Sequence, residues 1–276
     1  MFSNEEGKNT GSRRAGLRIG QDVGQKIGLK TGLKTGMRFL DRILAYDCGI
    51  ITLRARDPQF LFGLAANMIV RNHDADSKTQ DPEPKTLYLH WVDYHRRYWT
   101  LDHDLLVKVA KSVGADFASI SRNLYFVRAF TRDNIEVEEN WDMLAAFAEN
   151  TNLVILDSVS ELYETDRSKR GASLPINSKT VAYAIGRFVR ICMKNQCPGI
   201  VLDHAKMPIH PYLGEVSSVI VEFSSDGALV ARILKHPCIR ESSFIIHSQI
   251  GSQFGNSRTI FGRVHCAGQR TMRSWI

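Results

Sequence analysis

Residues 153–157 constrain the fold of this chain more than any other segment. They read Leu-Val-Ile-Leu-Asp, a continuous apolar run that ends in one acid. Such a run is typical of a strand that is buried on both faces, as in a parallel sheet covered by helices. The segment therefore predicts a central parallel strand that delivers one carboxylate, that of Asp157, to its carboxyl end.

Patterns typical of strands and helices alternate on both sides of this segment. Strand patterns occur at 49–55, 86–91, 124–129, 152–157 and 199–203, and helix patterns at 58–71, 102–114, 134–150 and 178–195. Three more strand patterns follow at 217–223, 228–234 and 243–247, the first two joined by a Ser-Asp-Gly turn. This order predicts an α/β fold, with a mainly parallel twisted sheet flanked by helices and a C-terminal antiparallel strand extension.

The net charge of +7 is concentrated at the two ends of the chain. Residues 1–38 carry +5 and residues 251–276 carry +4, which leaves −2 for the part between them. We therefore expect a basic N-terminal tail or linker over 1–34, with glycine at every fourth position from 16, a core domain over 35–250, and a basic C-terminal tail over 251–276. Basic tails favour a polyanionic partner, most simply nucleic acid.

Composition excludes several other classes. No apolar run approaches the length of a membrane span, so we expect no membrane partner. The first six residues include two acids, Glu5 and Glu6, where a signal peptide is basic and then apolar. The five cysteines are scattered and form no C-x-x-C pair, which favours reduced thiols over disulfides or a zinc site. We expect a cytoplasmic or nuclear protein, associated with the nucleoid if the chain is prokaryotic.

Six short motifs follow one another in a distinctive order. They stand at residues 35–44, 49–53, 128–130, 153–158, 166–171 and 231–237. In this order they resemble the core ATPase domain of the RecA/RadA recombinase family, in particular its archaeal RadA-like and eukaryotic recombinase-paralogue branch. The resemblance covers residues of about 35–248, and it implies a RecA-like core. It also implies that Asp157 and Ser158 belong to a nucleotide site and that residues 166–171 begin a DNA-binding loop.

The same resemblance shows where the nucleotide site has lost its characteristic residues. No segment matches G-x-x-x-x-G-K-[ST]. Phe62, followed by Gly63, takes the place of the phosphate-binding lysine, and Val92 takes the place of the glutamate that activates water. Because charge neutralisation and water activation are both lost, we expect a vestigial site without ATP hydrolysis. No cofactor is expected, and weak binding of ATP with magnesium is expected only if a partner subunit completes the site.

Basic residues in one loop and in both tails are the candidate DNA contacts. The loop that follows the central strand offers three of them, and a solvated charged loop explains them equally well. The full set is Arg167, Lys169, Arg170, Lys206, Arg13, Arg14, Lys30, Lys34, Arg258, Arg263, Arg270 and Arg273. We expect single-stranded or branched DNA as the ligand.

The sequence leaves three functions open. The first is a non-catalytic recombinase paralogue, an accessory DNA-binding factor in homologous recombination and DNA repair that assembles with a recombinase or another paralogue, as a homo- or hetero-oligomer. The second is a RecA-like structural subunit of a non-DNA or tRNA-related complex, similar to the scaffold of Elongator. The third is a metal-dependent enzyme that uses His90, Asp93 and His204, although we expect no metal site.

Overall fold

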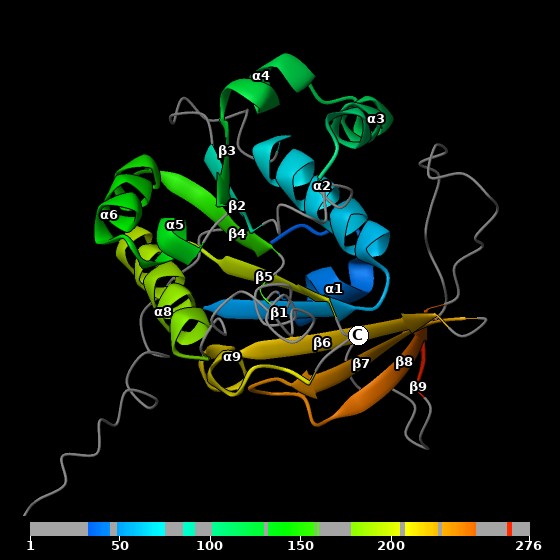
Figure 1. The fold of residues 1–276 in the computed structure, drawn as a ribbon. Helices are drawn as coiled ribbons and strands as arrows, with labels where there is room; N and C mark the ends of the chain where they lie inside the picture. Colours follow the sequence, from blue (N-terminus) through cyan, green and yellow to red (C-terminus); the bar gives the residue numbers. More distant parts are fainter. Residues whose placement is uncertain are drawn as a thin grey trace, which may run out of the picture.

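The computed structural model describes residues 33–44, 49–74, 85–91, 101–129, 132–157, 159, 178–204, 208–225, 228–246 and 264–266. Within these residues the strands form one nine-stranded sheet, in the order β3-β2-β4-β5-β1-β6-β7-β8-β9 (Figure 1). In chain order the strands are β1 (Ile50–Ala55), β2 (Lys85–Trp91), β3 (Leu124–Ala129), β4 (Thr151–Asp157), β5 (Gly199–His204), β6 (Val219–Ser225), β7 (Leu229–Lys235), β8 (Ser242–Ile246) and β9 (Val264–Cys266).

The sheet has a parallel part and an antiparallel part. The strands from β3 to β6 in that order all pair in parallel, whereas β7, β8 and β9 pair antiparallel. The predicted α/β fold with a C-terminal antiparallel extension is therefore confirmed. The extension reaches one strand further than the sequence patterns indicated, because β9 lies in the segment expected as a C-terminal tail.

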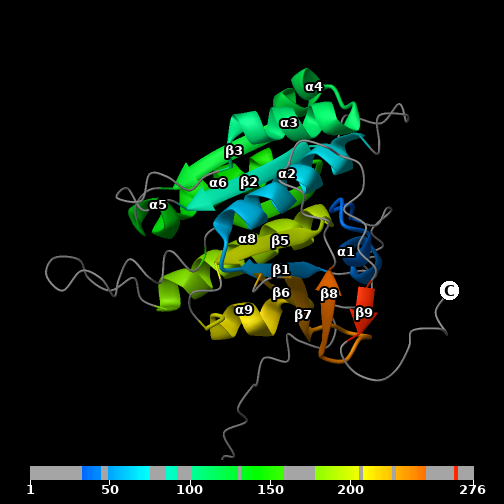
Figure 2. The same ribbon diagram turned by 90° about the vertical axis from the view of Figure 1, so that its right-hand side faces the viewer.

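Helices cover both faces of the sheet. The helices α2 and α3 lie on one side in Figure 1, and α5, α6 and α8 lie on the other. A view turned by 90° places α1 beside β8, where the Phe39 and Phe244 rings lie 4.8 Å apart (Figure 2). The helices are α1 (Arg38–Ile43), α2 (Pro58–Asp74), α3 (His103–Val113), α4 (Phe117–Arg122), α5 (Arg132–Glu136), α6 (Glu138–Phe147), α8 (Ser178–Asn195) and α9 (Pro211–Val216).

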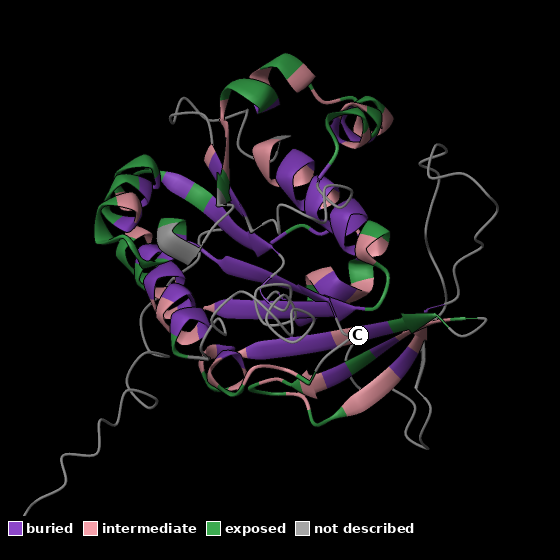
Figure 3. Cartoon of the chain, in the orientation of Figure 1, coloured by how far each residue is buried: buried purple, intermediate pink, exposed green. Residues whose placement is uncertain are grey.

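Alternation along the strands divides the core into two clusters. Successive side chains of a strand point to opposite faces of a sheet. In β1, Ile51 and Leu53 join the cluster that includes α2 and α3 residues, whereas Ile50 joins the cluster that includes α6 and α8 residues. Every residue of β1 and β5 is buried (Figure 3). Both faces of the central strands are thus covered, as the continuous apolar runs predicted.

One predicted helix is wrong in its extent. Instead of a single helix over 134–150, α5 and α6 are separated at Val137, which has extended backbone angles (φ −75°, ψ 118°). The indole of Trp141 donates to the carbonyl of Ile135 at 2.6 Å, and both residues are buried in the core. Burial of these two side chains against the sheet fixes the break. Within the described residues, no helix is long and apolar enough to cross a bilayer.

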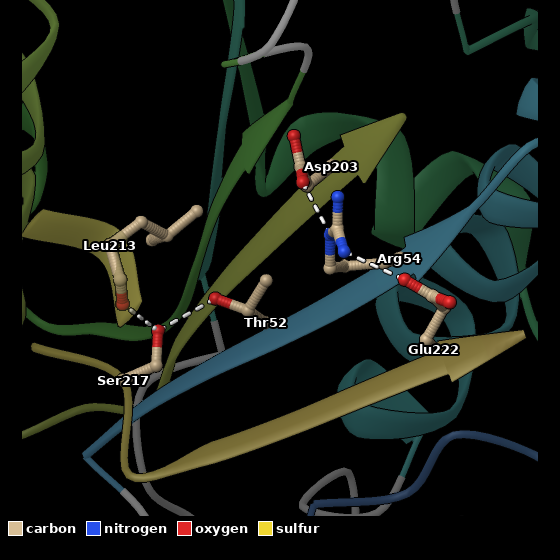
Figure 4. A network of polar contacts seen from close by, with 6 residues as sticks. All are labelled: Thr52, Arg54, Asp203, Leu213, Ser217 and Glu222. Carbon is tan, nitrogen blue, oxygen red and sulfur yellow. Dashed lines mark hydrogen bonds and ion pairs between the residues drawn. The ribbon is translucent and has the colours of Figure 1, made fainter. Parts of the chain in front are cut away.

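A largely buried ion-pair network joins three neighbouring strands, near the carboxyl ends of β1 and β5 and at the middle of β6 (Figure 4). Arg54 on β1 stands in register with Asp203 on β5 and with Glu222 on β6. Its Nε donates to Asp203 at 2.7 Å, and its Nη1 donates to Glu222 at 2.7 Å. The side chains of Arg54 and Asp203 are 6% and 5% exposed. A buried charge of this kind persists only when it is paired.

The same face carries a second polar chain nearer the start of β1. The hydroxyl oxygens of Thr52 and Ser217 lie 2.7 Å apart, and the Ser217 hydroxyl donates to the carbonyl of Leu213 at 2.7 Å (Figure 4). Because Ser217 has one hydroxyl proton, Thr52 must donate to Ser217. This chain of hydrogen bonds ties α9 to the sheet.

Replacing Arg54 tests how much the ion-pair network stabilises the fold. We expect Arg54→Met to lower the free energy of unfolding by about 3–5 kcal/mol, because the buried carboxylate of Asp203 then lacks the guanidinium that neutralises it. Urea denaturation of the two proteins measures the difference. The control is Arg56→Met, which removes an exposed arginine two residues away and should change stability by less than about 0.5 kcal/mol. Equal effects of the two substitutions would contradict the assignment.

Candidate functional site

A buried polar cluster lies at the carboxyl edge of the parallel strands, on the face that α2 covers. Its centre is Asp157, the last residue of β4. His90 on β2 stands directly opposite Asp157 in register, and His204 ends the neighbouring strand β5. All three residues are buried, with exposed fractions of 0%, 0% and 3%. In open α/β sheets this edge is where ligands bind.

Two donors converge on one oxygen of Asp157. The Tyr88 hydroxyl donates to Oδ2 at 2.7 Å, and His90 Nδ1 lies 2.7 Å from the same oxygen. The Nε2 atom of His204 lies 3.7 Å from the other oxygen, Oδ1. Tyr88 and His90 are two residues apart in β2, so their side chains point to the same face. The alternation of the strand therefore brings both donors to one carboxylate.

The cluster keeps Asp157 ionised. Burial alone raises the pKa of Asp157, but hydrogen bonds and charge from His204 and His90 outweigh burial and hold its pKa well below the ordinary value of 3.8. An ionised carboxylate is an acceptor only, so His90 donates through Nδ1. Burial raises the pKa of Tyr88 well above 10.0, and the charge of Asp157 and its hydrogen bond with Asp157 add to that effect. Tyr88 is therefore the neutral donor.

Aromatic rings enclose the cluster. The ring of Phe126 on β3 stacks on Tyr88, with centroids 5.0 Å apart and planes at 9°. Phe62, which lies in α2 and is 1% exposed, meets His204 edge-on at 6.2 Å. The Phe62 side chain thus occupies core space above the sheet. The carbonyl of Gly63 accepts from the side-chain amide of Asn67 at 2.8 Å.

The carboxylate of Asp57 caps the amino end of α2. An exposed carboxylate, that of Asp57, accepts from the backbone N–H of Gln59 at 2.9 Å. Helix amino ends attract phosphate because their N–H groups are unpaired and their dipole is positive. Here a fixed negative charge uses one of those groups. Phe60, one residue on, packs against Phe223 with ring centroids 4.9 Å apart.

Most of the predicted DNA contacts lie outside the described residues. Of that set, only Lys34 is described; it is exposed, and its backbone exchanges two hydrogen bonds with the side chain of Asn72. Ser158, expected in a vestigial nucleotide site, and Val92, expected at the place of a glutamate, also lie outside the described residues. The predicted DNA-contact loop with Arg167, Lys169 and Arg170 therefore stays a prediction, and so does Lys206, which follows β5.

The structure brings together two of the three residues of the metal hypothesis. His90 and His204 both face Asp157, whereas Asp93 lies outside the described residues. Across the part of the chain that is described, no three His, Cys, Asp or Glu side chains form a group that could hold a metal ion. His90 Nδ1 is engaged with the carboxylate, and its Nε2 is buried without a hydrogen-bond partner in the described part of the chain.

Sequence reasoning missed Tyr88 and the Arg54 network. Tyr88 and Arg54 each leave a signal, because each is a polar residue between two apolar neighbours in a strand pattern. The alternation of β2 places Tyr88 and His90 on one face, which the spacing of two residues alone indicates. Their meeting with Asp157 needs the strand order as well, because β2 and β4 are separated by more than fifty residues of chain.

Comparison with models of protein families finds no family that matches this chain, and a search of curated proteins finds no matching relative.

Replacing the central carboxylate tests how far the cluster stabilises the fold. We expect Asp157→Asn to lower the free energy of unfolding by about 2–5 kcal/mol, because the neutral amide cannot accept from Tyr88 and His90 as a carboxylate does. Tyr88→Phe removes one donor and should cost about 1.5–3 kcal/mol. Urea denaturation at neutral pH measures both. A loss below that of Tyr88→Phe would contradict the central role of Asp157.

The pH dependence of the free energy of unfolding, compared between the wild type and Asp157→Asn, tests whether Asp157 stabilises the fold in its ionised form. A depressed pKa of Asp157 in the folded state means that its contribution is complete above 3.8 and is lost as the pH falls below that value. The stability gap between wild type and Asp157→Asn should therefore stay level from neutral pH down to about pH 4.5 and shrink below it. A gap that closes near neutral pH would show that another group controls the cluster.

Proposed function

We propose that this chain is a non-catalytic protein of the RecA/RadA type, an accessory factor that binds single-stranded or branched DNA and assembles with a recombinase or a paralogue. The observation that carries the non-catalytic part is the internal engagement of Asp157. A carboxylate that holds magnesium must offer an oxygen to the ion and its waters. Asp157 is fully buried and accepts from Tyr88 and His90.

The strand order supports the RecA-like part of the proposal. In phosphate-loop proteins a strand leads through the phosphate loop into a helix. Here β1 leads into α2, and β4 lies one strand away across β5, with its acid at the same edge. That is the relation expected between a phosphate loop and an acid that holds magnesium. In the proposed function Asp157 keeps the position of that acid, but it no longer takes part in nucleotide chemistry.

Two features of α2 support the loss of nucleotide binding. Phe62, at the place of the lysine, lies in the core and not at the helix surface. Asp57 adds a negative charge at the helix end where phosphate would bind. Each feature opposes a triphosphate independently of Asp157. A single substitution at the lysine position is therefore insufficient to restore binding.

The charge distribution supports a nucleic-acid partner. Residues 1–38 and 251–276 together carry more positive charge than the whole chain does, because the middle is slightly acidic. Basic segments release counterions from DNA on binding, which gives a strongly salt-dependent affinity. A structural subunit of a complex without nucleic acid would not need this separation of charge, so DNA binding distinguishes the proposal from that alternative.

DNA binding is tested with the full chain and charge reversals. Fluorescence anisotropy with a labelled single strand and a branched duplex, over a range of salt, gives the affinity and its salt slope. We expect Arg167→Glu, Lys169→Glu and Arg170→Glu together to weaken binding and to lower the slope by about one unit for each phosphate that the variant no longer neutralises. Reversals of Arg13 and Arg14 should act in the same direction.

The matched control reverses basic residues of the core. Lys108 and Lys111 are exposed on α3, so Lys108→Glu with Lys111→Glu makes the same change of charge, four units, as reversal of Lys169 and Arg170 alone, with which it is compared. We expect this control to lose much less affinity. If the wild type does not bind either DNA at low salt, or if both sets of reversals weaken it equally, the DNA-binding proposal fails and the scaffold function takes its place.

Nucleotide binding is tested by thermal unfolding with and without millimolar ATP and magnesium. A ligand at about 100 times its dissociation constant would stabilise the folded state by about 2.7 kcal/mol, which raises the melting temperature measurably. We expect no rise for the wild type and none for Phe62→Lys, because Asp57 and the engaged Asp157 remain. A clear rise for the wild type would contradict the loss of the site.

A further inference from the structure

The segment that leads into α1 is the second copy of a four-residue repeat. Residues 29–32 and residues 33–36 both read Leu-Lys-Thr-Gly. Each copy is followed by a large apolar residue, which is Leu33 after the first copy and Met37 after the second. The structure describes the second copy, whereas the first lies outside the described residues. The contacts of the second copy therefore show what a segment of this sequence binds.

The side chain of Asn72 on α2 binds the backbone of the second copy. The backbone N–H of Lys34 donates to Oδ1 of Asn72 at 3.1 Å, and Nδ2 of Asn72 donates to the carbonyl of Lys34 at 2.9 Å. The same Nδ2 also donates to the carbonyl of Met68, one turn earlier in α2, at 2.6 Å, which fixes the orientation of the amide. Because these bonds use only the backbone of Lys34, any residue with a backbone N–H satisfies them.

The other three residues of the second copy fill places that select their residue types. Leu33 is 7% exposed and joins the core cluster that includes α2 residues. The backbone N–H and the hydroxyl of Thr35 both donate to Oδ1 of Asp41 at 2.6 Å. Gly36 has a left-handed φ of 81°, and a Cβ atom there would lie 2.8 Å from Nε of Arg71. An apolar residue, a hydroxyl and a glycine are thus required in this order.

We propose that α1 and α2 form a docking site for the sequence Leu-Lys-Thr-Gly, and that residues 29–32 of the same chain occupy this site in a second register. Two observations identify the occupant. It has the same sequence as the segment that the site already holds, and it is joined directly to that segment. In the first register residues 33–36 are bound. In the second register the chain moves by four residues, and the first copy is bound in place of the second.

A shift by four residues replaces each contact of the second copy by an equivalent one. Thr31 donates to Asp41, and Gly32 takes the position that requires a left-handed backbone. Leu33 takes the place of Met37, which is 7% exposed and belongs to the core. Leucine and methionine have similar volumes, and cores tolerate their exchange. The match therefore extends over five consecutive positions.

The first register is the more stable one, because the second leaves residues 34–37 as a loop ahead of α1. Closing such a loop costs conformational entropy. The carbonyl of Met37 also accepts from the backbone N–H of Asp41 at 2.9 Å, and the shift removes Met37 from this end of α1. The second register is therefore populated when the first is blocked.

The shift changes how much of the basic N-terminal segment precedes the docking site. Residues 1–32 precede the bound copy in the first register, and residues 1–28 precede it in the second. Because both copies contain a lysine, the exposed position that Lys34 holds keeps its positive charge in either register. The docking site thus shortens the reach of the N-terminal segment by four residues, which is about 13 Å of extended chain, without releasing it.

Residue-resolved amide hydrogen exchange of the full chain distinguishes the two registers, because the threonine amide that donates to Asp41 is protected. Gly36→Ala blocks the first register, since its Cβ meets the side chain of Arg71 and alanine is strained at a left-handed φ. In this variant we expect the protection factor of the Thr31 amide to rise by about tenfold and that of the Thr35 amide to fall by a similar factor. An unchanged Thr31 amide would overturn the proposal.

A pair of double variants tests whether the gain comes from the first copy. In Gly32→Ala with Gly36→Ala neither copy fits the site, so the Thr31 amide should lose the protection that it gains in Gly36→Ala. The matched control, Gly20→Ala with Gly36→Ala, adds an alanine outside both copies and should keep that gain. Equal protection of Thr31 in the two double variants would show that the first copy does not dock.

A second single variant blocks the first register without adding atoms against α2. Lys34→Pro removes the N–H that donates to Asn72, whereas in the second register residue 34 lies in the loop ahead of α1. The Thr31 amide should gain protection here as well, while the amides of β1 keep theirs and report an intact core. If the amides of β1 stay protected and Thr31 gains nothing, the second register does not exist.

Protein concentration distinguishes the same chain from a second molecule as the source of the bound copy. Docking within one chain gives a gain of protection at Thr31 that is the same over a hundredfold range of concentration. A gain that grows with concentration would assign the site to the first copy of another molecule and would overturn the second register.

Discussion

The burial of one carboxylate in the middle of the sheet is the constraint on which the site depends. An aspartate without water must have donors, or it gives up its charge. Asp157 obtains them from Tyr88 and His90 on the neighbouring strand, and His204 lies on the other side, 3.7 Å from the second oxygen. These partners fix the register of β2 against β4 and leave the aromatic rings of Phe126 and Phe62 to close the cluster.

On the opposite face of the same sheet, an arginine neutralises the buried carboxylate. Arg54 spans β5, β1 and β6 and neutralises acids on both neighbours. Buried carboxylates thus hold polar partners on both faces of the sheet near its carboxyl edge, at the place where many α/β proteins bind ligands. In the proposed function this edge is structural, and the partners are recognised through the basic ends of the chain.

The architecture was accessible from the sequence because it rests on periodic patterns. The strand β3 and the helix α8 were predicted with the bounds that the structure has, and the late antiparallel strands were predicted in order. The predicted helix over 134–150 was wrong because its break at Val137 arises from the burial of Trp141 and Ile135, which is a tertiary effect. The short elements α4, α9 and β9 were not predicted, because three to six residues are too few to show a hydrophobic periodicity.

The sequence by itself determined that a carboxylate ends a strand pattern, that no phosphate-loop motif is present and that positive charge lies at the ends. These properties depend on residue identity and on local spacing. Only the tertiary structure decided that Asp157 meets Tyr88 and His90, that Arg54 lies between Asp203 and Glu222, and that Asn72 binds the backbone of Lys34. Strand order and register create those contacts between residues far apart in the chain, and hydrophobic periodicity specifies the face of a strand but not its neighbour.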